Sequence, residues 1–363
     1  MKICDVTLRE ADQMPGRSYT KKQKIEAGKA LDRLGVDIIE AGFPITGKID
    51  QQVIRELSET LNAEVSGLAR FRIEDIDAAL DANADLIQIF TPVDDEDLNN
   101  IVGCSRTQMH EHMRTAVDHS QQSGTAVNIT LVNAMRADFN HVVEMFDLFS
   151  DVSNIGVADS VGCRTPAFAE QFFSDLSENG VDLSQVGAHF HDDLGVATAN
   201  TLKAHAAGVG RSDVAVAALG ERAGNTSLEQ VVAAANLEQD ETFGLDVSEL
   251  IPVCRKVLDL LNEPINSRAP LLGGDVVRHE AGLHTAVMLD APNTFEPFDP
   301  ARFGGTRELV FGTNTGRRGA QKLLEQVNRN PQKALVEKLL TKFDEEGPLG
   351  VDKALEMAEK IKI

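Results

Sequence analysis

The sequence predicts an α/β fold, a (β/α)8 TIM barrel followed by a small, mainly helical C-terminal annex. Three observations support this prediction. Short apolar runs alternate with longer amphipathic runs from the N-terminus to about residue 237, as in successive βα units. Eight such pairs occur in that stretch, which is the number that closes a parallel barrel. Beyond it the alternation stops and helical patterns follow.

Eight segments have the composition of strands, and each precedes a helical pattern such as Lys21–Leu34 or Pro166–Asn179. The predicted strands are Ile3–Leu8, Asp37–Ala41, Glu64–Ala69, Leu86–Phe90, Ala126–Leu131, Asn154–Ala158, Gln185–Phe190 and Ser212–Ala217. A doubly wound open sheet is the alternative arrangement. No glycine-rich phosphate-binding turn follows the first strand, where Arg9–Gln13 stands instead, so the closed barrel is favoured.

The annex is predicted to consist of separate helices. The expected elements are helices over Asp246–Leu261 and Asp275–Leu289, loops over Pro264–Gly274 and Ala291–Gly316, and helical structure over Arg317–Ile363 with a break near Gly347. We place the domain boundary after residue 262, so that residues 1–262 form the catalytic barrel and residues 263–363 form the annex.

The chain is strongly acidic. It has 57 Asp and Glu against 35 Lys and Arg, a formal net charge of -22, and the acidic residues are spread along its whole length. Such a surface repels polyanions, so neither nucleic acid nor an anionic membrane is an expected partner. We hypothesise a high-salt cytoplasm, where dense counterions screen the self-repulsion. The dependence of the melting temperature on KCl would test this hypothesis.

The four cysteines are Cys4, Cys104, Cys163 and Cys254. They are far apart and form no CxxC pair, so neither a disulfide framework nor a zinc ribbon is indicated. No apolar run approaches the roughly 18 to 20 residues that a membrane span needs, and no leader precedes the first strand. We expect reduced thiols and a soluble, cytoplasmic protein.

Ionisable residues gather at the predicted carboxyl ends of the first, seventh and eighth strands, the catalytic face of such barrels. Residues two apart share one face of a strand, so His189 and His191 point the same way. With Glu10 across the barrel mouth they would form a facial metal site with open positions. Taken singly, they also suit satisfied core histidines and a strand-end carboxylate, and Asp192 or Asp193 is expected to cap the next helix. Their joint occurrence favours the metal site.

Six motifs occur in order along the chain. They are Asp5–Glu10 with Gln13, Glu40–Pro44, Ala158–Gly162, His189–Asp193, Gly220–Asn225 and Arg278–His284. Together they resemble the motifs of the 2-isopropylmalate, homocitrate and citramalate synthases, the acyl-CoA-dependent, Claisen-type DRE-TIM metallolyases. The resemblance covers nearly the whole chain. It implies an acyltransferase of amino-acid biosynthesis that condenses acetyl-CoA with a 2-oxo acid and releases CoA.

The resemblance also implies a metal centre. Glu10, His189 and His191, with Asn225 close by, would hold a divalent metal, Mg²⁺, Mn²⁺ or Zn²⁺, that polarises the carbonyl of the 2-oxo acid. Arg9 would bind substrate and act catalytically, as a cation placed where negative charge develops on oxygen. The bare triad also suits a non-haem Fe(II) oxygenase, and oxygen-dependent turnover would distinguish that chemistry.

Further matches imply substrate and partner contacts. Gln13 would orient the thioester side, Arg136 would bind substrate, and Ser160 stands where the family has a carboxylate-binding Thr. His284 matches a histidine that the neighbouring subunit supplies for proton transfer, which implies a homodimer with exchanged C-terminal segments and an annex that acts as a lid. The alternatives are a turn residue for Ser160 and a structural role for His284.

Three places depart from the family pattern. Asp95 aligns with a histidine of the loop after strand four, the Glu-Asp pair expected before Arg136 is absent, and Phe295 replaces a Tyr. These positions concern the second substrate. The sequence therefore supports the part of the site that binds the metal and the oxo acid better than the part that binds the thioester. The carboxylates of Asp94–Glu96 would repel CoA, and we interpret them as a solvated loop.

The leading interpretation is a 2-isopropylmalate synthase-like enzyme of leucine biosynthesis acting on 2-oxoisovalerate or a related 2-oxo acid, which Gly42–Pro44 weakly favours. The alternatives are a homocitrate or citramalate synthase, or a lyase running in reverse on a hydroxy-acyl-CoA or hydroxy-oxo acid. A non-catalytic paralogue is disfavoured because the four metal-site residues are present. The resemblance is to short forms without the leucine-binding regulatory domain, so feedback inhibition through that domain is not expected.

Overall fold

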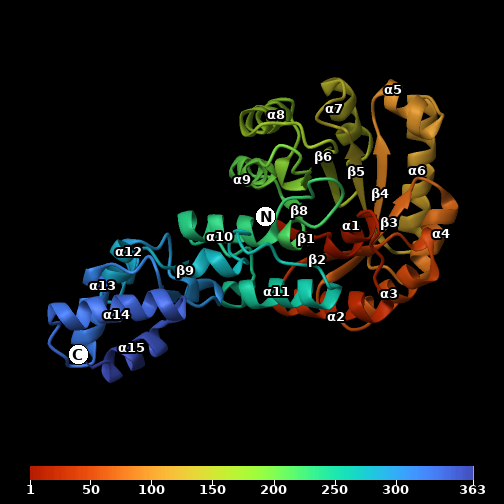
Figure 1. Ribbon diagram of the computed structural model, residues 1–363. Helices are drawn as coiled ribbons and strands as arrows, with labels where there is room; N and C mark the ends of the chain where they lie inside the picture. Colours follow the sequence, from red (N-terminus) through yellow and green to blue (C-terminus); the bar gives the residue numbers. More distant parts are fainter. Residues whose placement is uncertain (363) are drawn as a thin grey trace. The chain divides into compact units, whose positions relative to one another are not determined.

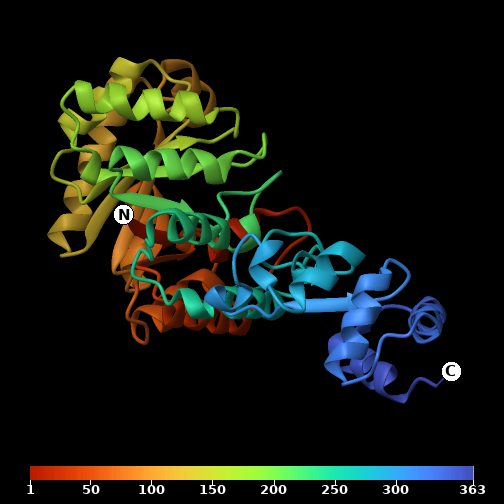
Figure 2. The ribbon, with the colours of Figure 1, turned by 90° about the vertical axis from the view of Figure 1, so that its left-hand side faces the viewer.

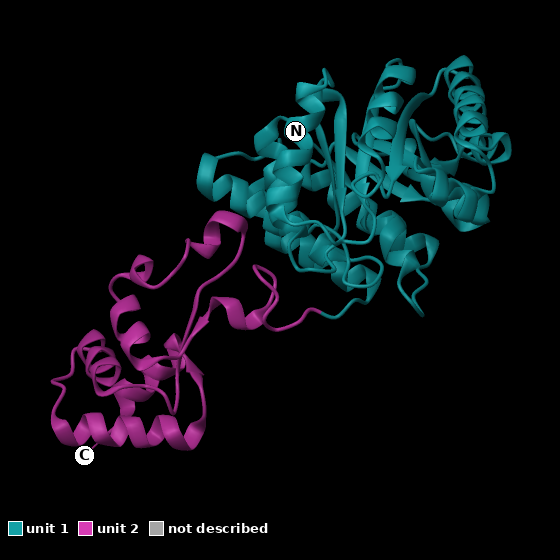
Figure 3. Ribbon diagram, turned by 90° about the horizontal axis from the view of Figure 1, so that it is seen from above, with its two compact units in different colours: residues 1–264 teal, residues 265–363 magenta. Residues whose placement is uncertain are grey.

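The computed structural model describes residues 1–362 and divides the chain into two compact units, residues 1–264 and 265–363 (Figure 3). The predicted closed parallel barrel is confirmed (Figure 1). Its strands are β1 (Lys2–Asp5), β2 (Ile38–Gly42), β3 (Glu64–Arg70), β4 (Leu86–Pro92), β5 (Ala126–Val132), β6 (Asn154–Asp159), β7 (Val186–Phe190) and β8 (Arg211–Val214). Strand β1 pairs in parallel with both β2 and β8, which closes the sheet.

Helices cover the outside of the barrel. The longer ones are α2 (Lys21–Leu34), α3 (Lys48–Ser58), α4 (Ile73–Asp81), α6 (Arg106–Gln122), α7 (Phe139–Leu148), α8 (Pro166–Glu178), α9 (Ala197–Ala207), α10 (Leu228–Gln239) and α11 (Leu250–Leu261). Helices α8 and α9 pack side by side (Figure 1, Figure 2). Asp192 accepts a hydrogen bond from the amide of Ala197, the first residue of α9, as expected for one of the two carboxylates after His191.

Two predicted strands end earlier than expected. The first was predicted to reach Leu8, but β1 stops at Asp5 because that side chain accepts hydrogen bonds from the Thr7 amide and hydroxyl, and Thr7–Glu10 forms the helical turn α1. The eighth was predicted to reach Ala217, but β8 stops at Val214. There the Val216 amide donates to the Thr7 hydroxyl at 2.9 Å, which bends the chain into a 3-10 turn.

The second unit is mainly helical, as predicted, but also contains a small sheet. Its helices are α12 (Gly282–Met288), α13 (Arg317–Gln326), α14 (Lys333–Glu346) and α15 (Val351–Lys360). Its strands, in spatial order, are β11 (Leu349–Gly350), β10 (Glu308–Phe311) and β9 (Arg278–His279). Phe311 and Phe343 lie in the core that these elements share.

Two helix predictions are corrected near this unit. Asp275–Leu289 is not one helix, because Arg278 and His279 pair with β10 and a side chain at Gly282 would collide with the backbone of Gly316. Helix α12 therefore begins only at Gly282. The predicted helix Asp246–Leu261 begins as a 3-10 turn over Val247–Glu249, and the α-helix starts at Leu250. Within residues 1–362, no helix has the length and apolar character needed to cross a bilayer.

Candidate active site and metal centre

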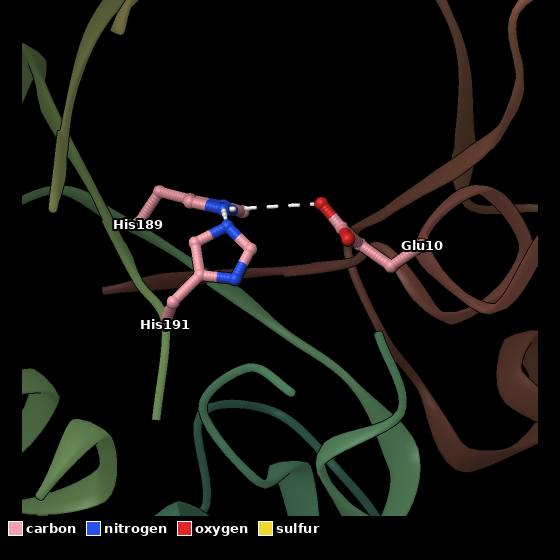
Figure 4. Close-up of side chains that lie close together, drawn as sticks. All are labelled: Glu10, His189 and His191. Atoms are coloured by element: carbon pink, nitrogen blue, oxygen red, sulfur yellow. Dashed lines mark hydrogen bonds and ion pairs between the residues drawn. The ribbon is translucent and has the colours of Figure 1, made fainter. Parts of the chain in front are cut away.

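Two histidines and a glutamate meet at the carboxyl ends of the barrel strands (Figure 4). Glu10 ends the helical turn after β1, His189 lies on β7, and His191 follows β7 directly. All three are buried, and one potential ligand atom from each lies within 4.8 Å of the other two. The structure thus brings together the three residues that the sequence singles out as metal ligands.

The alternation of side chains along β7 aims both imidazoles at this group. Phe190, between them, packs instead against Phe173 of α8, with ring centroids 6.5 Å apart. The Nε2 atoms of His189 and His191 face each other at 3.2 Å. A single ion bound at about 2.1 Å from each nitrogen would permit this separation. The two rings are therefore spaced for one shared ion.

Oxygen atoms that could bind a metal lie beside the histidines. Glu10 Oε1 lies 3.9 Å from His189 Nε2. Within residues 1–362, Glu10 Oε2 and Asn225 Oδ1 are buried without a hydrogen-bond partner. A Cβ at Gly220 would collide with the Asn225 amide and lie 3.2 Å from Glu10 Oε2, so this glycine leaves the space open. Carboxylate, amide oxygen and imidazole donors together fit a divalent cation.

The His191 imidazole is in the neutral form that binds metal. Burial, and then the neighbouring His189, lower the pKa of His191 to about 4, so this ring is neutral near pH 7. His189 Nδ1 lies 3.2 Å from Asp213 Oδ2. A neutral His189 donates its Nδ1–H to that carboxylate and keeps the Nε2 lone pair for the group in Figure 4. Asp213 is not among the site residues predicted from the sequence, although it lies two residues after Arg211 on β8.

Arg9 lies between two carboxylates beside the metal group. Its Nε donates to Glu40 Oε1 at 2.6 Å, and its Nη1 pairs with Glu10 and lies 3.3 Å from Gln13 Oε1. Burial opposes the charge of Arg9, but Glu10 and Glu40 outweigh burial and raise its pKa above the usual value. The guanidinium is therefore a fixed cation. Arg136, by contrast, is exposed and makes no side-chain hydrogen bond or ion pair within residues 1–362.

Arg222 connects the loop that follows β8 with the loops that follow β6 and β7. Its Nη2 donates to the Ser160 carbonyl at 2.8 Å, and its Nε pairs with Asp193 at 3.0 Å. The Ser160 hydroxyl oxygen accepts a hydrogen bond from the Asn133 amide at 2.9 Å. The hydroxyl hydrogen of Ser160 then stays available to donate to a substrate carboxylate. Sequence analysis assigned no role to Arg222, although it lies in one of the six motifs.

The acidic loop after β4 points mainly to solvent. Asp95, at the position where the family carries a histidine, has an exposed side chain, and so has Glu96. Asp97 is half-buried, and its Oδ2 accepts a hydrogen bond from Asn133 Nδ2 at 2.9 Å. The exposure of Asp95 and Glu96 agrees with the solvated-loop interpretation.

In the second unit, His284 lies in the first turn of α12 rather than deep in a longer helix. Its ring stacks on Phe295, with centroids 4.1 Å apart and an interplanar angle of 16°. Phe295 is the residue that stands for the family's Tyr. Phe295, which departs from the family pattern, therefore contacts His284, the histidine to which the resemblance gives a proton-transfer role.

Asp5 is buried beneath the site, and no cationic side chain within residues 1–362 pairs with it. Its carboxylate accepts hydrogen bonds from the Thr7 amide at 2.9 Å and the Thr7 hydroxyl at 3.1 Å. Burial, partly opposed by these bonds, raises the pKa of Asp5 from 3.8 to about 7. A carboxyl whose folded-state pKa lies above its unfolded value stabilises the fold at low pH and loses that contribution as pH rises through the folded pKa.

Substitution of Asp5 by asparagine should therefore stabilise the protein progressively as pH rises. Relative to wild type, we expect a gain of about 3 kcal/mol in the free energy of unfolding between pH 5 and pH 8. Urea unfolding of the metal-free proteins at several pH values measures this difference in the free energy of unfolding. Asp81→Asn, at an exposed carboxylate of the same unit, is the matched control. Parallel pH profiles for wild type and Asp5→Asn would contradict the argument.

Comparison with known proteins gives two family matches that together cover most of the chain. A family model described as HMGL-like matches residues 1–257. A second, described as homocitrate synthase post-HMGL domain-like, matches residues 271–347. The hydroxymethylglutaryl-CoA lyase of Pseudomonas aeruginosa has a similar solved structure, with TM-score 0.66 and 19% identity, covering 74% of this chain and 95% of that one. At that identity the likeness concerns the fold alone.

Three curated relatives are each 33% identical to this chain. A homocitrate synthase of Methanopyrus kandleri is matched over 94% of this chain and 86% of its own length. An (R)-citramalate synthase of Methanocaldococcus jannaschii is matched over 96% and 72%, and a probable 2-isopropylmalate synthase of Methanopyrus kandleri over 96% and 70%. Their names give three different products at one level of identity, so identity does not choose among those products.

Proposed function

This chain belongs to the HMGL-like family, and from that membership we propose that it condenses acetyl-CoA with a 2-oxo acid in a metal-dependent, Claisen-type reaction that releases CoA. It is an enzyme of the acyltransferase class, as its synthase relatives are. The observation that carries the proposal is the buried Glu10, His189 and His191 group with Arg9 beside it.

The residues at the barrel mouth have separate roles in metal binding and in charge stabilisation. Glu10, His189 and His191, together with the free oxygen of Asn225, would hold the divalent cation, which when bound polarises the carbonyl of the oxo acid. Arg9 presents a permanent charge to the oxygen that becomes negative. Because the metal-site side chains are buried and the Arg9 side chain is only 12% exposed, that electrostatic stabilisation acts with little screening by water.

The proposal also assigns residues that contact the second substrate and the partner subunit. Ser160 would donate its hydroxyl to the substrate carboxylate, while Gln13 and Arg136 would serve the substrate and thioester side. We propose a homodimer with exchanged C-terminal segments, in which His284 transfers a proton in the partner's site. Phe295, stacked on His284, fixes the plane of that ring in the annex.

The acceptor that we favour is 2-oxoisovalerate or a related 2-oxo acid, as in a 2-isopropylmalate synthase. Gly42–Pro44 at the end of β2 supports an apolar acceptor side chain. Homocitrate and citramalate synthesis remain the other outcomes within this reaction type, and each requires a different acceptor.

Release of free thiol from acetyl-CoA tests the proposal. Purified protein would be assayed with pyruvate, 2-oxoisovalerate and 2-oxoglutarate, each with Mg²⁺ or Mn²⁺ in molar KCl, because the net charge of -22 favours high salt. We expect metal-dependent CoA release with one acceptor well above the others. If no acceptor supports release, while a hydroxy-acyl-CoA or hydroxy-oxo acid is cleaved, the lyase alternative replaces the proposal.

A further inference from the structure

A buried arginine and aspartate lie side by side on β8, inside the barrel. Arg211 and Asp213 are two residues apart on β8, so their side chains share one face of the strand. Arg211 is 3% exposed and Asp213 is 6% exposed. Arg211 Nε lies 3.3 Å from Asp213 Oδ1. Burying such a pair is costly, and leaving either charge without its partner is more costly still.

The other end of Asp213 contacts a proposed metal ligand. Asp213 Oδ2 lies 3.2 Å from His189 Nδ1, so one carboxylate joins Arg211 to His189. With Nδ1–H donated to the carboxylate, the His189 Nε2 lone pair faces His191 Nε2. The tautomer of His189 is thereby set by Asp213.

Arg211 is itself held from the opposite wall of the barrel. Its Nη1 donates to Gln88 Oε1 on β4 at 2.9 Å, and Gln88 Nε2 donates to Thr130 Oγ1 on β5 at 2.6 Å. The contact of Arg211 on β8 with Gln88 on β4 is possible only across the barrel interior. The guanidinium is therefore fixed at both ends, by Gln88 and by Asp213.

Two glycines leave room for this guanidinium. Gly156 of β6 pairs with Gly187 of β7, and Gly187 pairs with Arg211. A Cβ at Gly187 would lie 3.2 Å from Arg211 Nε and Nη2, and one at Gly156 would lie 3.4 Å from Nη2. The next two strands around the barrel, β7 and β6, thus lack a side chain where the guanidinium passes.

We propose that Arg211 is a positioning residue for the metal centre. It acts through Asp213 to hold His189 in the Nδ1–H tautomer, with Nε2 directed toward the metal position. Arg211 starts β8, so the residue that sets the ligand geometry lies at the opposite end of the barrel from the chemistry. The functional meaning of this role rests on the proposed metal centre, but the tautomer can be measured without any metal.

The test compares Arg211→Met with Arg211→Lys. Spectra of ¹⁵N-histidine-labelled, metal-free protein report the tautomer of His189, assigned with His189→Gln. Titration calorimetry with Mn²⁺ reports affinity. We expect Arg211→Met to move His189 partly to the Nε2–H tautomer and to weaken Mn²⁺ binding about 10- to 100-fold. Arg211→Lys keeps the charge facing Asp213, and we expect its affinity within about threefold of wild type.

A milder pair of variants decides the question if Arg211→Met does not fold. Gly187→Ala places a Cβ 2.6 Å from Asn154 Oδ1 and 3.2 Å from the Arg211 guanidinium, so it displaces both side chains and should weaken Mn²⁺ binding. Gly67→Ala on β3 is the control for an added methyl group on a barrel strand, since its Cβ would meet Ile54 and Pro44 at 3.3 Å and not Arg211. Its affinity should equal that of wild type.

The outcomes separate this inference from the proposed function. An unchanged His189 tautomer and unchanged Mn²⁺ affinity in Arg211→Met or Gly187→Ala, with binding still lost in His191→Ala, would overturn the role of Arg211 and leave the metal centre intact. Absence of Mn²⁺ binding by wild type would overturn the metal centre and this role together.

Discussion

Replacing His191 by alanine is expected to lower the affinity for Mn²⁺ about a hundredfold or more and to abolish metal-dependent CoA release. The substitution removes one of the three side chains, Glu10, His189 and His191, whose ligand atoms lie within 4.8 Å of one another. The remaining pair, Glu10 and His189, has its closest atoms 3.9 Å apart and lacks the second imidazole that faces His189. Glu10→Ala should have the same consequence for turnover. Titration calorimetry and the thiol-release assay measure the two effects.

The control for this prediction is an exposed histidine of the same unit. His119 on α6 pairs with Asp77 at 2.7 Å on the outside of the barrel, so His119→Ala should retain Mn²⁺ affinity and turnover. Far-ultraviolet circular dichroism would show that the variants keep the fold. Full activity in both His191→Ala and Glu10→Ala would refute the assignment of the site.

The barrel could be predicted because its strands are buried on both faces and appear in the sequence as short apolar runs. The end of β8 could not, because it depends on a contact between residues 209 positions apart, from the Val216 amide to the Thr7 hydroxyl. The same limit applies to β9. Arg278 and His279 have a helical sequence pattern, but pairing with Glu308 and Leu309 of β10 makes them a strand.

Part of the candidate site could be predicted for a local reason. His189 and His191 share a face through the two-residue period of a strand, and Glu10 follows another strand end, so the sequence alone brings them near one another. Glu40 and Asp213 could not be assigned in that way. Their partners, Arg9 and His189, lie on neighbouring elements, and only the pairing of those elements makes the contacts.

Arg9→Met should reduce kcat of CoA release by about 10²- to 10³-fold, because it removes the cation placed where negative charge develops. It should also destabilise the fold by about 3 to 5 kcal/mol, since the carboxylates of Glu10 and Glu40, 2% and 3% exposed, lose the charge between them. A rate measured on a half-unfolded sample would confuse these effects, so kcat is normalised to the folded fraction from circular dichroism.

The double variant Arg9→Met/Glu40→Gln separates stability from catalysis. Removing the Glu40 charge together with its partner leaves only Glu10 unpaired, so we expect part of the lost stability to return while kcat stays low. Arg114→Met on α6 is the matched control, because it breaks an arginine–carboxylate pair with Asp151, 2.8 Å long, on the outside of the barrel. It should lower the free energy of unfolding by at most about 1 kcal/mol and leave kcat unchanged.

If the double variant recovers kcat along with stability, Arg9 is only a structural counter-ion for two carboxylates, and its assignment to the developing charge is wrong. If stability returns and the rate does not, the charge of Arg9 itself accelerates the reaction.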